Sequence, residues 1–128
     1  MDRHICKAKD IKTGEWVYGY YVALPDEYTH GQDMVHAIFT LECEHVCMGE
    51  YKDIGWHEVD PETVCQCAGL SDKNGTIIFE NDCIGHKLNV VEYFDGSFCI
   101  NGDTPLCYMN KYYQVVGNKF DYGVLNNG

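Results

Sequence analysis

The first part of the chain alternates apolar stretches with turn residues. A turn signal at residues 12–14 separates two candidate strands within residues 5–23. Side chains alternate along a strand, so one face of the second strand carries Trp16, Tyr18, Tyr20 and Val22. Val17 and Tyr21 fill the other face. Because both faces are partly apolar, the pattern predicts a strand that is covered on both sides.

The next segment opens with a polar, broken stretch that predicts a loop over residues 24–36. A strand is predicted for residues 37–43, and a shorter one for residues 56–60. Asp60 and Pro61 suit the start of a helical turn, with Asp60 as its N-cap. The same residues equally suit a turn into the following strand, so both alternatives stand.

The clearest hairpin signal is Asn74 followed by Gly75. This pair predicts a type I′ turn, which needs a positive φ at both central positions. The apolar stretch over residues 76–80 is the strand expected after the turn. A sharp turn at residues 81–82 follows, and residues 83–94 continue as one or two strands.

The last third contains two more turns. Asp95 and Gly96 predict a second hairpin, which returns through residues 97–100. After a third turn, Thr104 is suited to cap a short helix through about Asn110. The remaining elements are a last strand over residues 112–117 and a loosely held tail over residues 118–128.

Short strands at close spacing, separated by glycine turns, predict a mainly β protein with a small, strongly curved sheet or barrel. A length of 128 residues fits one domain or a domain with an appendage. A composition that is 45% hydrophobic and 13% aromatic is too apolar for a disordered chain.

Charge and hydropathy narrow the classes of function. Nine basic and twenty acidic residues give a formal net charge of −11, and such a surface repels phosphate backbones. We therefore expect no direct nucleic-acid binding. No apolar run approaches the roughly 20 residues of a membrane helix, and the first residues lack the apolar core of a signal peptide. The expected location is the cytoplasm, without a membrane partner and with reduced cysteines.

The best metal-binding candidates are Cys43, His45, Cys47, Cys65 and Cys67. If residues 43–47 form a strand, their three side chains share one face. Such neighbours are about 6.6 Å apart, which is wider than two sulfurs on one zinc ion prefer. The Cys-x2-Cys spacing of most zinc sites is absent. We expect no metal site, and zinc bound by Cys43, Cys47, Cys65 and Cys67 is the alternative.

The sequence carries none of the common catalytic patterns. The Cys65-x-Cys67 pair lacks the spacing and the helix start of a thioredoxin-like redox site. Eight cysteines and six histidines make chance Cys–His pairings easy in any fold, so such a pairing carries little information. A Gly-rich phosphate loop and a nucleophile elbow are both missing. We therefore expect a protein without enzymatic activity, catalytic residues or a cofactor.

Residues 63–84, TVCQCAGLSDKNGTIIFENDCI, resemble the signature of the YopX family of phage and prophage proteins. That signature reads Gly-Gln-Tyr/Phe-Thr-Gly-Leu, then Asp-Lys-Asn-Gly, then Ile-Tyr/Phe-Glu-Gly-Asp. The matching positions are Gln66, Gly69, Leu70, Asp72, Lys73, Asn74, Gly75, Ile78, Phe79, Glu80 and Asp82. Cys65, Cys67 and Asn81 depart from it; at position 81 an asparagine tolerates the positive φ of the family's glycine.

The resemblance implies a mostly β fold with a small SH3-type barrel in the C-terminal part. The cap signals described above add one or two short helical turns to the expected fold. Residues 1–60 would form an N-terminal β segment packed on the barrel, and residues 61–128 the barrel region, or the two would make one domain. It also implies a phage or prophage setting. It implies no catalytic residues.

The favoured function is a phage accessory protein that binds another protein through exposed aromatic side chains. The candidates are Trp16, Trp56, Tyr18, Tyr20, Tyr93 and Tyr112. A zinc-binding Cys/His module or enzyme is one alternative, and an acidic decoy that imitates nucleic acid is another. A homo-oligomer is compatible with open strand edges.

Overall fold

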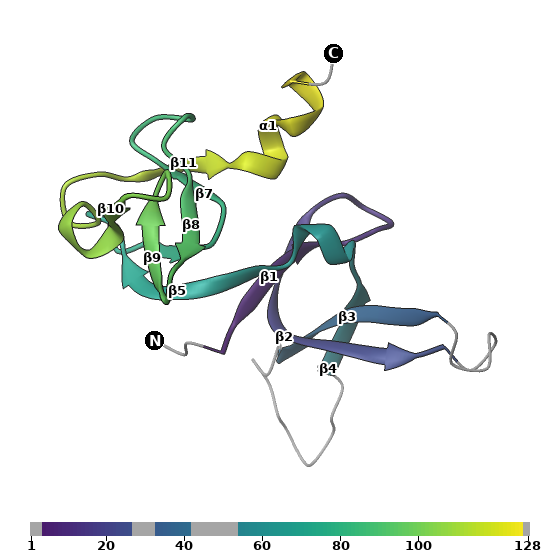
Figure 1. Ribbon diagram of the computed structural model, residues 1–128. Helices are drawn as coiled ribbons and strands as arrows, with labels where there is room; N and C mark the ends of the chain where they lie inside the picture. The colour runs from purple at the N-terminus through teal and green to yellow at the C-terminus, as the bar shows by residue number, and fades with distance from the viewer. Residues whose placement is uncertain (1–3, 27–32, 42–53, 127–128) are drawn as a thin grey trace. The chain divides into compact units, whose positions relative to one another are not determined.

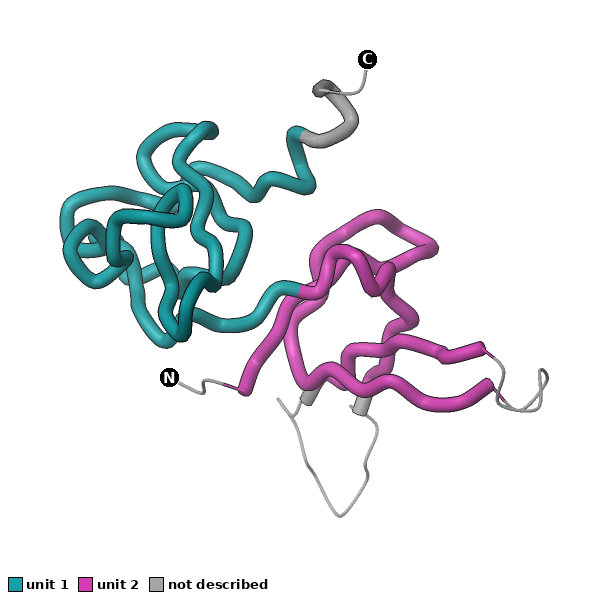
Figure 2. Tube along the Cα trace, in the orientation of Figure 1, with its two compact units in different colours: residues 1–3, 65–128 teal, residues 4–64 magenta. Residues whose placement is uncertain are grey.

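The computed structural model describes residues 4–26, 33–41 and 54–126, and within them the chain is mainly β (Figure 1). It divides into two compact units, one of residues 4–64 and one of residues 65–128 with residues 1–3 (Figure 2). No helix of the described part is long and apolar enough to cross a membrane.

The 4–64 unit is an antiparallel meander in the order β4-β3-β2-β1. Its elements are β1 (Cys6–Lys9), β2 (Trp16–Pro25), β3 (Met34–Leu41), β4 (Ile54–Glu58) and the 3-10 helix η2 (Pro61–Thr63). The loop predicted for residues 24–36 is therefore wrong at both ends, because Leu24 pairs with Val35 inside the β2–β3 ladder. Residues 27–32 and 42–53 lie outside the described part.

Strand β2 pairs with two different neighbours. Its residues 16–19 pair with β1, and its residues 20–25 pair with β3. Gly19 stands at the change, where a Cβ would lie 2.2 Å from the carbonyl oxygen of Phe39. Because that atom is backbone, only glycine allows β3 to approach so closely.

One face of the meander holds the core of the unit. Ala8, Ile38 and Val59 are buried there, and Val17 and Tyr21 pack against them. Asp10 and Val59 form a single antiparallel bridge between the chain after β1 and the chain after β4. That one bridge does not close a barrel.

Helix η2 decides between the two alternatives for Asp60 and Pro61. The side chain of Asp60 accepts a hydrogen bond of 3.0 Å from the backbone N–H of Glu62, and Pro61 opens the helix. The predicted helical turn with its Asp N-cap is confirmed.

The 65–128 unit is built from short strands. Its elements are β5 (Cys65–Ser71), β6 (Ile77–Phe79), β7 (Asp82–Ile84), β8 (Val91–Phe94), β9 (Ser97–Ile100), β10 (Thr104–Pro105), the 3-10 helix η3 (Leu106–Tyr108), β11 (Val115–Asn118) and α1 (Lys119–Asn126). Strand β5 pairs with β6, β7 with β11, and β9 with both β8 and β10. Buried Ile78, Ile84, Val91, Ile100 and Leu106 form its core. The mainly β expectation is confirmed, while these pairings among the described residues do not close a barrel.

The hairpin turns follow the sequence signals with one correction. At Asp95 and Gly96 both φ angles are positive, 52° and 87°, as a type I′ turn requires. At the first hairpin only Gly75 has a positive φ, so the predicted type I′ turn is wrong there. A longer loop joins β5 to β6, and it is held by the side chain of Asp72, which accepts hydrogen bonds from the N–H groups of Asn74 and Thr76.

The end of the chain differs from its prediction. Residues 119–126 form helix α1 instead of a loose tail, and Asn118 caps it by accepting a hydrogen bond from the N–H of Phe120. Helix η3 covers only residues 106–108 and has no side-chain cap. Thr104 therefore is not the predicted cap; its hydroxyl bonds to Asp103 instead.

Candidate functional site

The face of the 4–64 sheet opposite its core carries a row of aromatic side chains. Tyr20 pairs with Phe39 across β2 and β3, and Phe39 pairs with Trp56 across β3 and β4. Directly paired residues of antiparallel strands place their side chains on the same face. The Trp56 side chain is 57% exposed, so the row ends in a large apolar group that water contacts.

A groove lies beside this row. Ala37 pairs with Val22 on one side and with Glu58 on the other, in the row of the sheet next to the aromatic one. Its short side chain leaves a hollow of about 430 Å³ between larger neighbours. The lining residues are Leu24, Pro25, Asp26, Val35, Ala37, Phe39 and Trp56. Ala37 is thus the floor of an apolar groove, which we call the Ala37 groove.

Charged residues mark the two ends of this sheet face. Asp26 lines the Ala37 groove, and its N–H donates a hydrogen bond of 2.9 Å to the carbonyl oxygen of Asp33. At the other end of β2, the ammonium groups of Lys7 and Lys9 lie 4.7 and 5.3 Å from the ring centre of Trp16. The groove therefore lies at the acidic end of the face.

The structure brings some of the predicted aromatic residues together and separates others. Tyr20 and Trp56 lie in one row, and Tyr18 and Trp16 follow along the same side of β2. Tyr93 and Tyr112 belong to the 65–128 unit, where the Tyr93 ring packs edge-on against Phe98 at 5.1 Å. Sequence reasoning missed Phe39 and Ala37, because their positions in the groove depend on strand register.

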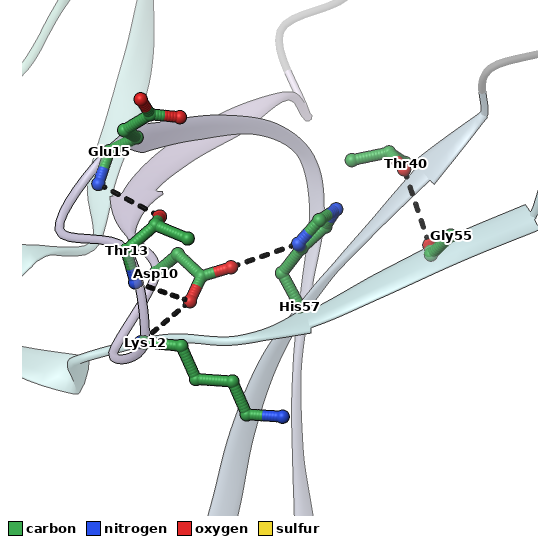
Figure 3. Close-up of polar contacts among 7 residues, drawn as sticks. All are labelled: Asp10, Lys12, Thr13, Glu15, Thr40, Gly55 and His57. Atoms are coloured by element: carbon green, nitrogen blue, oxygen red, sulfur yellow. Dashed lines mark hydrogen bonds and ion pairs between the residues drawn. The ribbon is translucent and has the colours of Figure 1, made fainter.

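A separate group of polar residues lies at the turn after β1 (Figure 3). Asp10 accepts hydrogen bonds from the N–H groups of Lys12 at 2.7 Å and Thr13 at 3.3 Å, and it contacts Nδ1 of His57 at 3.0 Å. The hydrogen bond from Lys12 is the largest cause that lowers the pKa of Asp10, and His57 and Thr13 add to it against the effect of burial. This carboxylate is used to hold the turn against β4.

The Asp10–His57 pair has no nucleophile in the contacts that Figure 3 draws. The nearby hydroxyl of Thr40 donates to the carbonyl oxygen of Gly55 at 3.3 Å. A catalytic triad would need that hydroxyl to donate to the imidazole. The arrangement therefore resembles a structural pair more than a catalytic one.

Only two of the five candidate metal ligands, Cys65 and Cys67, lie in the described part. Cys65 and Cys67 are buried in β5, where Cys65 accepts from the side-chain amide of Asn118 at 3.9 Å and Cys67 accepts from the N–H of Gly69 at 3.4 Å. Cys43, His45 and Cys47 lie outside the described residues. Among the residues that are described, no three His, Cys, Asp or Glu side chains are grouped to hold a metal ion.

Two buried carboxylates organise the backbone of the 65–128 unit. Asp72 accepts hydrogen bonds from Asn74, Thr76 and, on its other oxygen, from the N–H of Val115 at 2.8 Å. Asp82 accepts from the N–H of Phe79 at 2.8 Å and from the side-chain amide of Asn118 at 3.0 Å. Each carboxylate joins a turn in the signature block to the last strand.

The model of a protein family described as YopX protein matches residues 7–125. The chain belongs to the YopX family. Searches of curated proteins and of solved structures gave no match.

In this YopX protein, several residues of the signature block have a structural role that their contacts or backbone angles explain. Asp72 and Asp82 hold turns, and Gly69 and Gly75 adopt φ values of 78° and 84°. Asn81, which replaces the glycine of the signature, has a φ of 70°, as expected of an asparagine in that turn. The block therefore specifies the fold, and the Ala37 groove lies outside it.

We expect Asn118→Asp to destabilise the 65–128 unit of the YopX protein by about 3 kcal/mol, because it places a second carboxylate against buried Asp82. Asn118→Ala removes the same hydrogen bond, together with the cap on the N–H of Phe120, but it adds no charge, and we expect it to cost less. Urea unfolding of both variants at neutral pH measures the difference. Equal losses would show that charge repulsion at Asp82 is absent.

Proposed function

We propose that this YopX protein is a non-enzymatic accessory protein of a phage or prophage that binds a protein partner through the Ala37 groove. The observation that carries the proposal is an apolar groove with a buried floor at Ala37 and a largely exposed tryptophan at its rim. Tryptophan is enriched among residues that dominate protein interfaces, and exposed apolar patches mark interaction sites.

The shape of the groove supports a side chain as its occupant. A hollow of about 430 Å³ lies within the size range of ligand sites, and its walls are mostly apolar. Val35 and Leu24 face it from one side, and Phe39 and Trp56 face it from the other. Large apolar side chains from a partner would displace water there, which is the main source of affinity in protein interfaces.

We also propose a barrel fold for one part of the chain and a cellular setting. The SH3-type barrel is proposed for residues 61–128, supported by the family resemblance and by short strands joined through glycine turns. The proposed setting is the cytoplasm of a bacterial host, supported by the same resemblance. The absence of enzymatic activity is proposed because the sequence carries no catalytic motif.

Filling the groove tests the proposal. Ala37→Leu extends a side chain from the floor into the hollow, and we expect it to lower partner capture by at least about tenfold. Ala23→Leu is the matched control, since Ala23 is exposed on the opposite face of β2. Affinity capture of the tagged protein from host cells, quantified by mass spectrometry, compares the two variants with the parent chain.

The proposal is wrong if Ala37→Leu recovers the same proteins in the same amounts as Ala23→Leu. If Ala37→Leu unfolds the unit, Trp56→Ala replaces it, because a side chain that is 57% exposed contributes little to the core. Tyr108→Ala, an exposed aromatic residue of the other unit, is the control for that variant.

A further inference from the structure

Resting on the proposed function, we infer that the Ala37 groove takes a basic, apolar segment of its protein partner: one or two large apolar side chains next to lysine or arginine. The apolar lining explains the first requirement, and the charge around the groove explains the second. The occupant is a segment of another protein, and binding of a second copy of this chain would be the competing result.

The groove is bordered by acidic residues. Asp26 lines it directly, and Asp33 is its cross-strand neighbour at the end of the β2–β3 ladder. Glu58 pairs with Ala37, so its side chain leaves the same face of the sheet, beside the lining residues of the groove and not among them. Among the described residues that line it, none is a lysine or an arginine. An apolar segment that carries positive charge therefore meets complementary charge on this side of the sheet.

The net charge of the 4–64 unit also favours a basic partner segment. Residues 4–64 hold twelve of the twenty acidic residues and four of the nine basic ones. Two of those four, Lys7 and Lys9, lie over the ring of Trp16 at the far end of the face. A basic segment would be steered toward this unit, and its association rate would fall with added salt.

The same charge argues against a second copy as the occupant. Two chains of this protein each carry a formal charge of −11, so they repel each other before the grooves can meet. Their apolar faces would also bring Asp26 of one copy near acidic residues of the other, and like charges that face each other across an interface cost affinity. A partner of opposite charge avoids both costs.

Nuclear magnetic resonance of the full chain with three synthetic peptides tests the inference. The first peptide carries two leucines flanked by lysines, the second replaces the lysines with glutamates, and the third replaces the leucines with serines. The two tryptophans of the chain give two indole N–H signals, which Trp16→Phe and Trp56→Phe assign. We expect the lysine–leucine peptide to shift the Trp56 indole signal and the backbone amides of Val35 and Phe39.

The expected differences follow from charge and burial. Each of the other two peptides should bind at least about tenfold more weakly. Asp26→Asn should weaken the lysine–leucine peptide by about threefold at low salt, as expected for one exposed ion pair. Ala37→Leu should abolish the shifts at Trp56, and Ala23→Leu should leave them unchanged.

The outcomes separate this inference from the proposed function. Equal binding of the glutamate–leucine peptide would overturn the basic partner class while leaving the groove as a binding site. Equal binding of the lysine–serine peptide would overturn the apolar requirement. The inference would also be overturned if none of the three peptides shifted the Trp56 indole signal. A Trp56 signal that moves when the protein alone is diluted would overturn it as well. The capture experiment with Ala37→Leu judges the groove independently of peptide charge.

Discussion

Replacing Gly19 with alanine is expected to destabilise the 4–64 unit by on the order of 3 kcal/mol or more. The added Cβ would lie 2.2 Å from the carbonyl oxygen and 2.9 Å from the carbonyl carbon of Phe39. Both atoms belong to the backbone of β3, so the clash is relieved only by moving one strand away from the other. Both tryptophans lie in this unit, and their fluorescence during urea unfolding therefore reports on it selectively.

Gly14→Ala is the control for this experiment, because it tests a glycine of the same unit without a close neighbour. Gly14 has a φ of 72°, and no atom of the described residues lies within 4 Å of its added Cβ. The expected loss is about 1 kcal/mol, the ordinary cost of a left-handed alanine. A Gly19→Ala variant that loses no more than this control would contradict the close approach of β2 and β3. Loss of the Ala37 groove should accompany unfolding, since β2 and β3 supply most of its lining.

The second large effect is expected at Asp72. Asp72→Asn replaces one of the two carboxylate oxygens by an amide NH₂ group, which cannot accept a hydrogen bond. Either the bond from Val115 on one oxygen or the two bonds from Asn74 and Thr76 on the other are therefore lost. We expect a loss of about 3 kcal/mol in the 65–128 unit. Hydrogen exchange of the Val115 amide measures the change at the bond itself. Asp95→Asn, in an exposed hairpin turn, is the matched control.

The Asp72 carboxylate should also make the stability of the 65–128 unit fall at low pH. Burial would raise the pKa of Asp72, but hydrogen bonds from the N–H groups of Val115, Thr76 and Asn74, with the charge of Lys73, outweigh it and lower the pKa below 3.8. The folded state thus binds the proton less tightly than the unfolded state does. The contribution of the ionised Asp72 to folding stability is present above the ordinary pKa of 3.8. It is lost as pH falls through the lower pKa of the folded state.

Unfolding measured between about pH 5 and pH 2 should therefore show a steeper loss of stability for the parent chain than for Asp72→Asn. Parallel curves for the two proteins would mean that Asp72 contributes nothing to acid sensitivity. The Asp95→Asn variant should follow the parent chain.

Local features of this fold could be predicted from the sequence, because the responsible residues are neighbours in the chain. The turns at Asn81 and Asp95 follow from the tolerance of Asn and Asp-Gly for positive φ. The N-cap at Asp60 needs only the N–H of Glu62, two residues on. In these cases the geometry is set within a few residues, so the sequence pattern is sufficient.

Features that depend on distant partners could not be predicted. The turn after Asp72 departs from type I′, and the same side chain also binds Val115, which is 43 residues away. Leu24 belongs to a strand although its surroundings are polar, because its ladder with Val35 supplies the missing hydrogen bonds. Helix α1 begins where Asn118 caps it, at a residue whose amide also binds Asp82.

The Ala37 groove likewise combines features that could be predicted locally with features that depend on distant residues. Trp56 and Tyr20 could be selected as exposed aromatic residues from composition and alternation. Their meeting through Phe39, and the hollow above Ala37, depend on the register of three strands. Register is a long-range property, and a shift of one of these strands by one residue would turn the side chains of that strand to the core face.

The pairing of β7 with β11 has a consequence for synthesis on the ribosome. Strands β1 to β4 are consecutive hairpin neighbours, so each can pair as soon as the next one has been made. Strand β7 ends at Ile84, and its partner β11 starts at Val115, near the end of the chain. In the nascent 65–128 unit, β7 and Asp72 therefore lack these partners until all the intervening residues have been made. A message that stops before the codon of Val115 yields an incomplete unit, whose exposed apolar strands are targets for chaperones or proteases.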